Sequence, residues 1–292
     1  MIPLKRITLI LIAILVSSYC HSQDQYKPVK PDSDYFASWS SYADKDVFVL
    51  EDFTTLSYRY TDNFLGAIDA SFRVRAIRNL RFKVNDMQAA GANLTIWSSL
   101  DSLALKDLVF ENMVIYTEKN GKIKKTTVKK KSIQAEIKQD HTLLKLADLG
   151  ATDGSIIDVE YSVNDVSKQQ HRWSAKTAYF TVSSTFLSII PEIYDYDVSL
   201  AGNKELEATR RSATGTLLGY YMPNVPLEKK LVTKTYYKIA KERGDDVSSA
   251  KQVFCGYEYL QYSTGDLAPS EGIANEVSTV ALKLVSINPI VY

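Results

Sequence analysis

Apolar and polar residues alternate strictly between positions 157 and 163, where the chain reads IDVEYSV. Successive strand residues point to opposite faces, so alternate apolar residues share one face and predict a half-buried strand. The apolar members of this alternation are Ile157, Val159, Tyr161 and Val163. Asp158 and Glu160 lie between them and are expected on a solvated face, as in an antiparallel sheet that is open to water on one side.

A second pattern predicts a hairpin. Val114, Ile115 and Tyr116 form a β-branched and aromatic run that ends shortly before Asn120-Gly121. This dipeptide readily takes the positive φ angles of a two-residue turn. We therefore expect the chain to return as a second strand through residues 122–133.

Strand-like runs recur along the rest of the chain and are separated by Pro, Gly and Asp. They cover residues 47–60, 70–84, 216–222, 231–239, 253–262 and 277–287. Residues 85–108 show no clear period and predict either a short helix or a loop. We expect an all-β fold, mainly an antiparallel β-sandwich, with two β layers or subdomains and few short helices.

Three phrases of this pattern resemble a known module. They are the hairpin NGKIKKTTVKKKSI, the turn ATDGS with the strand IIDVEYSV, and the strand TFLSIIPEIYDYDVSLAG. In this order they are similar to the uncharacterised β-sandwich domain that often precedes a transglutaminase-like core in bacterial envelope proteins. The resemblance covers residues 46–202 and implies a β-sandwich in the cell envelope, here without the transglutaminase core. That family has no defined biochemical role.

The N-terminus predicts export. Lys5-Arg6 precede an apolar run from Ile7 to Val16, and small or polar residues follow up to Ser22, where cleavage is expected. A membrane span needs about 20 apolar residues, so this run is too short and no later segment reaches that length. We expect an exported protein in the periplasm or associated with the outer membrane, without a transmembrane segment after cleavage.

Cys20 offers a lipoprotein alternative, which the sequence favours less. The preceding Ser18-Tyr19 match poorly the small residues that lipoprotein processing prefers. These observations divide the chain into a signal peptide at 1–22, a tether or loosely packed lead-in at 23–45, the β-sandwich at 46–202, and a second β layer or small β domain at 203–292.

Charge and cysteine content exclude several classes of protein. The chain has 35 Lys and Arg against 34 Asp and Glu, a formal net charge of +1, and loss of Lys5 and Arg6 on cleavage would make it −1. This balance predicts no nucleic-acid partner. Cys255 would be the only cysteine of the mature chain, so no internal disulfide is expected and stability must come from burial.

Catalysis is not predicted. A transglutaminase-like or papain-like site needs a thiolate that a histidine activates. His141 and His171 both precede Cys255, whereas the histidine of the resembling enzymes follows the cysteine. Cys255 also lies in the apolar phrase VFCGYEYL, which favours a buried structural thiol. The alternative is an enzyme-associated or degenerate transglutaminase-like or protease-like protein whose catalytic core is absent or supplied in trans.

Metal and cofactor sites are not predicted either. His141 and His171 stand outside any metal-binding spacing, which favours surface or strand-end positions for both. Asp195 and Asp197 alternate as residues of a solvated strand face do, and the chain has no EF-hand loop or phosphate-binding fingerprint. We therefore expect neither a metal ion nor a cofactor.

Lysines on the predicted hairpin form a candidate binding surface. Their concentrated charge suits an acidic partner. Lysines on an edge hairpin also keep it soluble and discourage pairing with another strand, so this simpler structural role stays open. The residues are Lys119, Lys122, Lys124, Lys125, Lys129, Lys130 and Lys131.

Six tyrosines and one serine are the remaining candidates for binding or modification. Tyrosine anchors interfaces but is also a favoured strand residue. The candidate aromatic interface comprises Tyr220, Tyr221, Tyr236, Tyr237, Tyr257 and Tyr259. Asp101-Ser102-Leu103 resembles an O-glycosylation acceptor of some Gram-negative envelopes, with a plain surface turn as the alternative. Together these patterns predict a non-catalytic envelope protein with a binding or scaffolding role, whose partner is an envelope protein or glycan.

Overall fold

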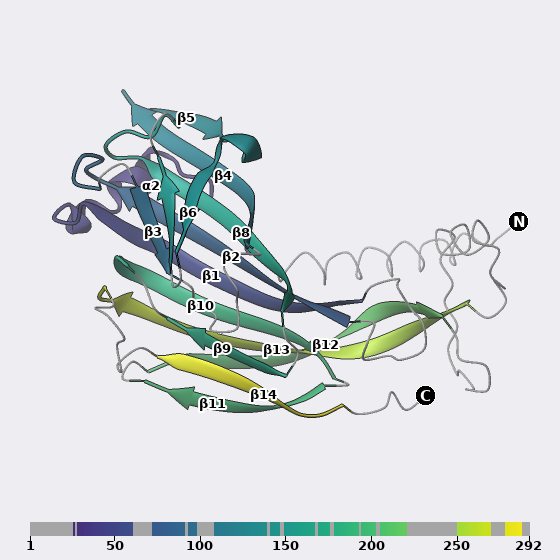
Figure 1. Ribbon diagram of the computed structural model, residues 1–292. Helices are drawn as coiled ribbons and strands as arrows, with labels where there is room; N and C mark the ends of the chain where they lie inside the picture. The colour runs from purple at the N-terminus through teal and green to yellow at the C-terminus, as the bar shows by residue number, and fades with distance from the viewer. Residues whose placement is uncertain are drawn as a thin grey trace, which may run out of the picture.

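The computed structural model is built almost entirely from β-strands (Figure 1). It describes residues 26, 28–60, 72–90, 93–97, 108–138, 141–146, 149–166, 169–175, 178–192, 194–202, 205–220, 250–269 and 278–287. The expected signal peptide lies outside these residues. Among the described residues, no helix has the length and apolar character that crossing a membrane requires.

Eight strands form one large sheet in the order β12-β13-β10-β1-β2-β8-β4-β5. The neighbours are antiparallel except β1 and β10, which run parallel. The strands are β1 (Val47–Tyr60), β2 (Phe72–Val84), β4 (Leu108–Lys119), β5 (Lys122–Thr127), β8 (Ile156–Val166), β10 (Phe180–Pro191), β12 (Glu207–Tyr220) and β13 (Ala250–Leu267). The expected all-β, mainly antiparallel fold is therefore confirmed.

Two three-stranded sheets complete the sandwich. One has the order β3-β7-β6 and the other β11-β14-β9. Their strands are β3 (Asn93–Trp97), β6 (Gln134–Ile137), β7 (His141–Lys145), β9 (Gln170–Ser174), β11 (Tyr194–Ala201) and β14 (Thr279–Ile287). All pairs in these two sheets are antiparallel.

Both small sheets cover the same face of the large sheet. On β2, Val74 and Ala76 belong to the apolar cluster beneath β9, β11 and β14, whereas Leu80 and Phe82 belong to the cluster beneath β3 and β7. These four residues are separated by even intervals on one unbroken strand, so they point to the same side. The sandwich thus has one long layer and one divided layer.

A short N-terminal segment packs on the opposite face of the large sheet. Asp32 caps helix α2 (Ser33–Ala37), because its side chain accepts a hydrogen bond from the backbone N–H of Tyr35. Phe36 then packs in a cluster with Tyr116 and Ile156. This part of the expected lead-in is therefore held against the sheet.

The N-terminal segment also changes the surroundings of Asp158. That residue was expected on a solvated face, but the fully buried guanidinium of Arg81 holds its carboxylate through two hydrogen bonds of 2.6 and 2.9 Å. Arg81 also donates to the Tyr35 hydroxyl at 3.2 Å. The expectation for Asp158 is wrong, because side chains of the lead-in cover this part of the face.

Strands on either side of residue 202 share the same sheets. β13 pairs with β10 from Thr181 to Pro191, and β14 pairs with both β11 and β9. Beyond the end of β10, β12 and β13 continue side by side as a two-stranded ribbon (Figure 1).

Residues 231–239, where a strand was expected, lie outside the described part. Within 85–108, residues 93–97 form the strand β3, which the sequence did not predict.

Candidate functional site

The lysine-rich hairpin is a regular two-stranded element at one edge of the large sheet. Asn120 and Gly121 have φ angles of 54° and 71°, the positive values that a tight two-residue hairpin turn requires. β5 pairs with β4 from Lys122 opposite Lys119 to Thr127 opposite Val114. The predicted hairpin is present, with β5 as the edge strand of the sheet, but its second strand ends at Thr127 rather than at Ile133 because a short 3-10 helix (Lys130–Ser132) follows.

All seven candidate lysines are exposed on this hairpin and the turn that follows it. Lys122 and Lys124 point to one side of β5 and Lys125 to the other, since strand side chains alternate. From residue 108 to 132, the span of β4, β5 and the turn after them, the chain carries these seven lysines and two acidic residues, Glu111 and Glu118, for a formal charge of +5. The positive charge therefore surrounds the edge strand on both sides.

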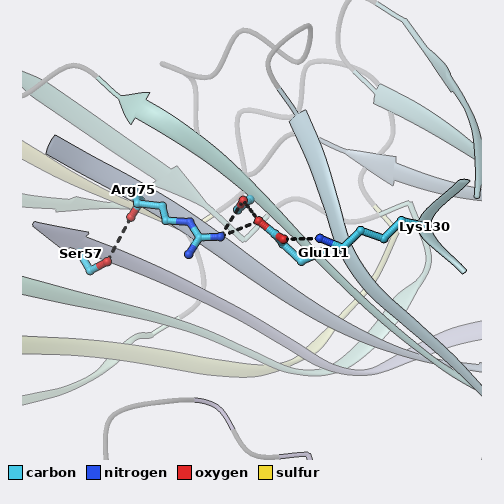
Figure 2. A network of polar contacts seen from close by, with 5 residues as sticks. Ser57, Arg75, Glu111 and Lys130 are labelled. Carbon is cyan, nitrogen blue, oxygen red and sulfur yellow. Dashed lines mark hydrogen bonds and ion pairs between the residues drawn. The ribbon is translucent and has the colours of Figure 1, made fainter. Parts of the chain in front are cut away.

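An ion-pair network attaches the base of this element to the sheet (Figure 2). Lys130, in the short helix η4 (Lys130–Ser132), donates to Oε2 of Glu111 at 2.9 Å. Oε1 of Glu111 accepts from Arg75 Nη2 at 2.6 Å and from Ser162 Oγ at 2.7 Å. Arg75 also donates to Ser162 Oγ at 3.0 Å, and its backbone carbonyl accepts from Ser57. The network links β1, β2, β8, β4 and η4.

The electrostatics of the network favour an ionised Glu111. Hydrogen bonds from Lys130 and Ser162 lower the pKa of the Glu111 carboxyl to about 2. The Lys130 side chain is 62% exposed, so its ion pair contributes at most about 1 kcal/mol to stability. Its main effect is to position the turn. Among the described residues, the other six lysines form no ion pair within 4.0 Å.

The candidate tyrosines are only partly within the described residues. Tyr259 is half-buried on β13, and the guanidinium of Arg211 lies 4.7 Å from the centre of its ring. Tyr220 and Tyr257 lie on β12 and β13, but their side chains are outside the described part. The remaining candidates, Tyr221, Tyr236, Tyr237 and Ser102, lie entirely outside it.

The candidate catalytic residues are distributed over three sheets. His141 begins β7 in one small sheet, His171 lies on β9 in the other, and the backbone of Cys255 lies on β13 of the large sheet. The Cys255 side chain is outside the described part. Within the described residues, no group of three or more His, Cys, Asp or Glu could hold a metal ion. Asp195 and Asp197 are exposed, as expected for a solvated strand face.

His171 differs from the expectation of a surface or strand-end residue, because it is fully buried among aromatic rings. Its Nε2 lies 3.2 Å from the Tyr58 hydroxyl, which is also hydrogen-bonded to the hydroxyl of Tyr196. Burial lowers the pKa of His171 to about 4. Among the described residues, its Nδ1 has no hydrogen-bond partner. The cluster therefore holds a neutral imidazole that the sequence did not reveal.

Comparisons with known proteins leave the family of this chain open. No family model and no curated protein matches it. One solved structure that aligns with this chain is a candidate protease from Parabacteroides distasonis, with a TM-score of 0.47 and 9% sequence identity. The alignment covers 82% of this chain and 40% of that structure, so the chain spans less than half the length of that protein.

Proposed function

We propose that the protein is an exported, non-catalytic component of the bacterial cell envelope that binds an acidic partner through its lysine-rich hairpin. It would act as a binding or scaffolding module of the type that precedes transglutaminase-like cores. The observation that carries this proposal is the segregation of charge. The hairpin and the turn after it, residues 108–132, have a formal charge of +5 in a chain whose net charge is only +1.

Segregated charge favours binding because it creates a local potential that attracts an acidic surface and steers its approach. The hairpin also presents this charge on a fixed element, since β5 is paired along its length and Lys130 is attached to Glu111. A positioned set of cations loses less conformational entropy on binding than a set on a mobile loop.

The envelope location rests on two further features. The basic pair Lys5-Arg6 and the apolar run after it are typical of a signal peptide. The three phrases between residues 120 and 202 resemble a module of envelope proteins. An envelope supplies acidic partners of both kinds, proteins and anionic glycans.

Replacing exposed lysines tests the proposal. Lys122, Lys124 and Lys129 are exposed and lie outside the Glu111 network, so their triple replacement by Gln should change the free energy of unfolding by no more than about 0.5 kcal/mol per site. The matched control replaces three lysines elsewhere in the chain by Gln and removes the same charge. These control residues are Lys45, Lys145 and Lys283.

Partner capture from detergent-solubilised envelope, followed by mass spectrometry, provides the readout. We expect the hairpin variant to lose the partner and the control variant to keep it. Capture by the wild type should weaken as salt is raised from 50 to 300 mM, because salt screens exposed charges beyond about 8 to 10 Å at physiological ionic strength. Polyglutamate and polygalacturonate, used as competitors, distinguish a protein partner from a glycan. Equal capture by both triple variants would show that the lysines only keep the edge strand soluble and prevent it from pairing with another strand.

A further inference from the structure

A cleft opens between the two layers of the sandwich, away from the lysine-rich hairpin. It lies between β11, the edge strand of one small sheet, and β12, the edge strand of the large sheet. Its volume is about 290 Å³. This size is near the lower end of small-molecule sites and suits one small ring rather than an extended ligand. The residues that matter for its chemistry are Tyr194, Asp195, Tyr196, Arg210, Glu258 and Tyr262.

The rear wall of the cleft is aromatic and held in place from behind. The ring of Tyr194 lies 5.1 Å from that of Tyr58, and the Tyr196 hydroxyl is hydrogen-bonded to the Tyr58 hydroxyl. The Tyr58 hydroxyl in turn contacts Nε2 of His171. Tyr194 and Tyr262 are buried, so the half-buried Tyr196 supplies the accessible ring surface, and its fixed position lowers the entropy cost of binding.

The mouth of the cleft carries a paired cation and anion. Arg210 on β12 donates through Nε to the carboxylate of Glu258 on β13, and their side chains are 73% and 26% exposed. The guanidinium keeps other N–H donors and the carboxylate keeps other acceptor sites, because this pair uses only part of the capacity of either group. The exposed carboxylate of Asp195 also lines the cleft, so its charged residues are one cation and two anions, which offer hydrogen-bond donors and a larger number of acceptors beside the aromatic wall.

We propose that this cleft binds one neutral sugar ring of a glycan. A sugar presents a face of C–H groups that packs on tyrosine rings, and hydroxyl groups that both donate and accept hydrogen bonds. An anionic ligand would be repelled by Asp195 and Glu258, a cationic ligand would compete with Arg210 for Glu258, and sugar hydroxyl groups can donate to both carboxylates without displacing Arg210. A purely apolar ligand would cover these charged groups without compensation, which costs free energy. The neutral, hydroxyl-rich ring avoids both costs.

Adjacent arginines on β12 provide a matched test. Arg210 lines the cleft, whereas Arg211 points to the opposite face and stacks on Tyr259. Arg210→Gln and Arg211→Gln remove the same charge from neighbouring positions of one strand. Isothermal titration calorimetry would measure binding of four neutral probes at up to about 10 mM, the range expected for a single weakly bound ring. The probes are hexamers of glucose in α-1,4 and β-1,4 linkage, of mannose and of N-acetylglucosamine.

We expect at least one neutral hexamer to bind the wild type and to bind Arg210→Gln about tenfold more weakly, as for loss of a charged hydrogen-bond donor. Arg211→Gln and the Lys122, Lys124 and Lys129 triple variant should bind like the wild type. The triple variant separates this cleft from the acidic-partner surface. Absence of binding by all four hexamers, equal loss in Arg210→Gln and Arg211→Gln, or binding of galacturonate hexamer alone would each overturn the proposal.

Discussion

His171 shows how one side chain is determined by its surroundings. Its imidazole is fully buried and meets the Tyr58 hydroxyl, while the tilted ring of Tyr196 lies 6.1 Å away between centroids. A neutral imidazole can accept the Tyr58 hydrogen bond through Nε2, whereas an imidazolium would be a buried charge with no carboxylate in the contacts described for it. Burial therefore keeps the ring neutral at pH 7.

The stability of the protein should depend on pH through His171. The pKa is about 4 in the folded protein and about 6.5 in the unfolded chain, so the unfolded chain binds more protons between these values. Above pH 6.5 the imidazole is neutral in both states and does not lower the free energy of unfolding. As the pH falls towards 4, protonation of the unfolded chain lowers that free energy by about 3 kcal/mol in all. Urea unfolding at several pH values between 7 and 4 would measure it.

The control for this prediction is His171→Phe, which removes the titrating group and keeps an aromatic ring in the cluster. Its free energy of unfolding should decline less between pH 6.5 and 4.5 than that of the wild type. Glu111 does not obscure this window, because its lowered pKa, about 2, affects stability mainly below pH 4.5. Parallel pH profiles of the wild type and His171→Phe would contradict the assignment.

Residue environments were the least predictable part of this chain. The lysine-rich hairpin is visible in the sequence, because its residues are neighbours along one turn. In contrast, Arg78 and Asp52 form a buried pair with two contacts of 2.8 Å, across two strands and 26 positions apart. Arg210 and Glu258 are 48 positions apart. No local pattern distinguishes such charged residues from solvated ones, because their partners are set by sheet register.

At the scale of elements, the β10–β13 pairing depends on a close approach of two backbones. A Cβ placed on Gly265 would lie 2.8 Å from the carbonyl oxygen of Val182. Ser183 on β10 pairs with Gly265 on β13, so the contacted atom belongs to the adjacent strand and has no side-chain freedom. Only a residue without Cβ fits here unless one strand shifts.

Replacing Gly265 by Ala should therefore destabilise the protein by about 1 to 3 kcal/mol, the usual cost of forcing extra atoms into a packed site. Chemical denaturation followed by circular dichroism would measure the change. Thr264→Ala provides the control on the same strand, since it removes atoms from a half-buried position and adds none. A Gly265→Ala variant as stable as Thr264→Ala would show that β13 shifts away from β10 without cost.

Elements were predicted well where local patterns are strong. The alternation at 157–163 and the Asn120-Gly121 turn identify β8 and the β4–β5 hairpin. The five-residue strand β3 escaped prediction, since its two buried residues, Leu94 and Ile96, give too short an alternation. The parallel pairing of β1 with β10 was also hidden, because it joins segments more than 120 residues apart.

At the scale of the whole molecule, the N-terminal segment covers part of one face of the large sheet rather than serving only as a tether. The ring of Tyr26 stacks on Phe53 with 5.3 Å between centroids, and its hydroxyl donates to Glu51. Further along, the ammonium of Lys83 lies 4.7 Å from the centre of the Phe36 ring. Loss of this segment would expose the part of the sheet face that it covers.

Cleavage after Ser22 keeps this segment, because it leaves Tyr26 near the new terminus. We expect the mature chain to begin at Gln23 and to be recovered from the periplasmic or outer-membrane fraction. Intact mass spectrometry of the fractionated protein would identify its N-terminal residue. The variant Leu11→Arg interrupts the apolar run from Ile7 to Val16, so its unprocessed chain should stay in the cytoplasm. A lipid-modified Cys20 would instead establish the lipoprotein form. Wild-type protein that keeps Met1 and stays in the cytoplasm would contradict export, and the acidic partner would then have to be sought outside the envelope.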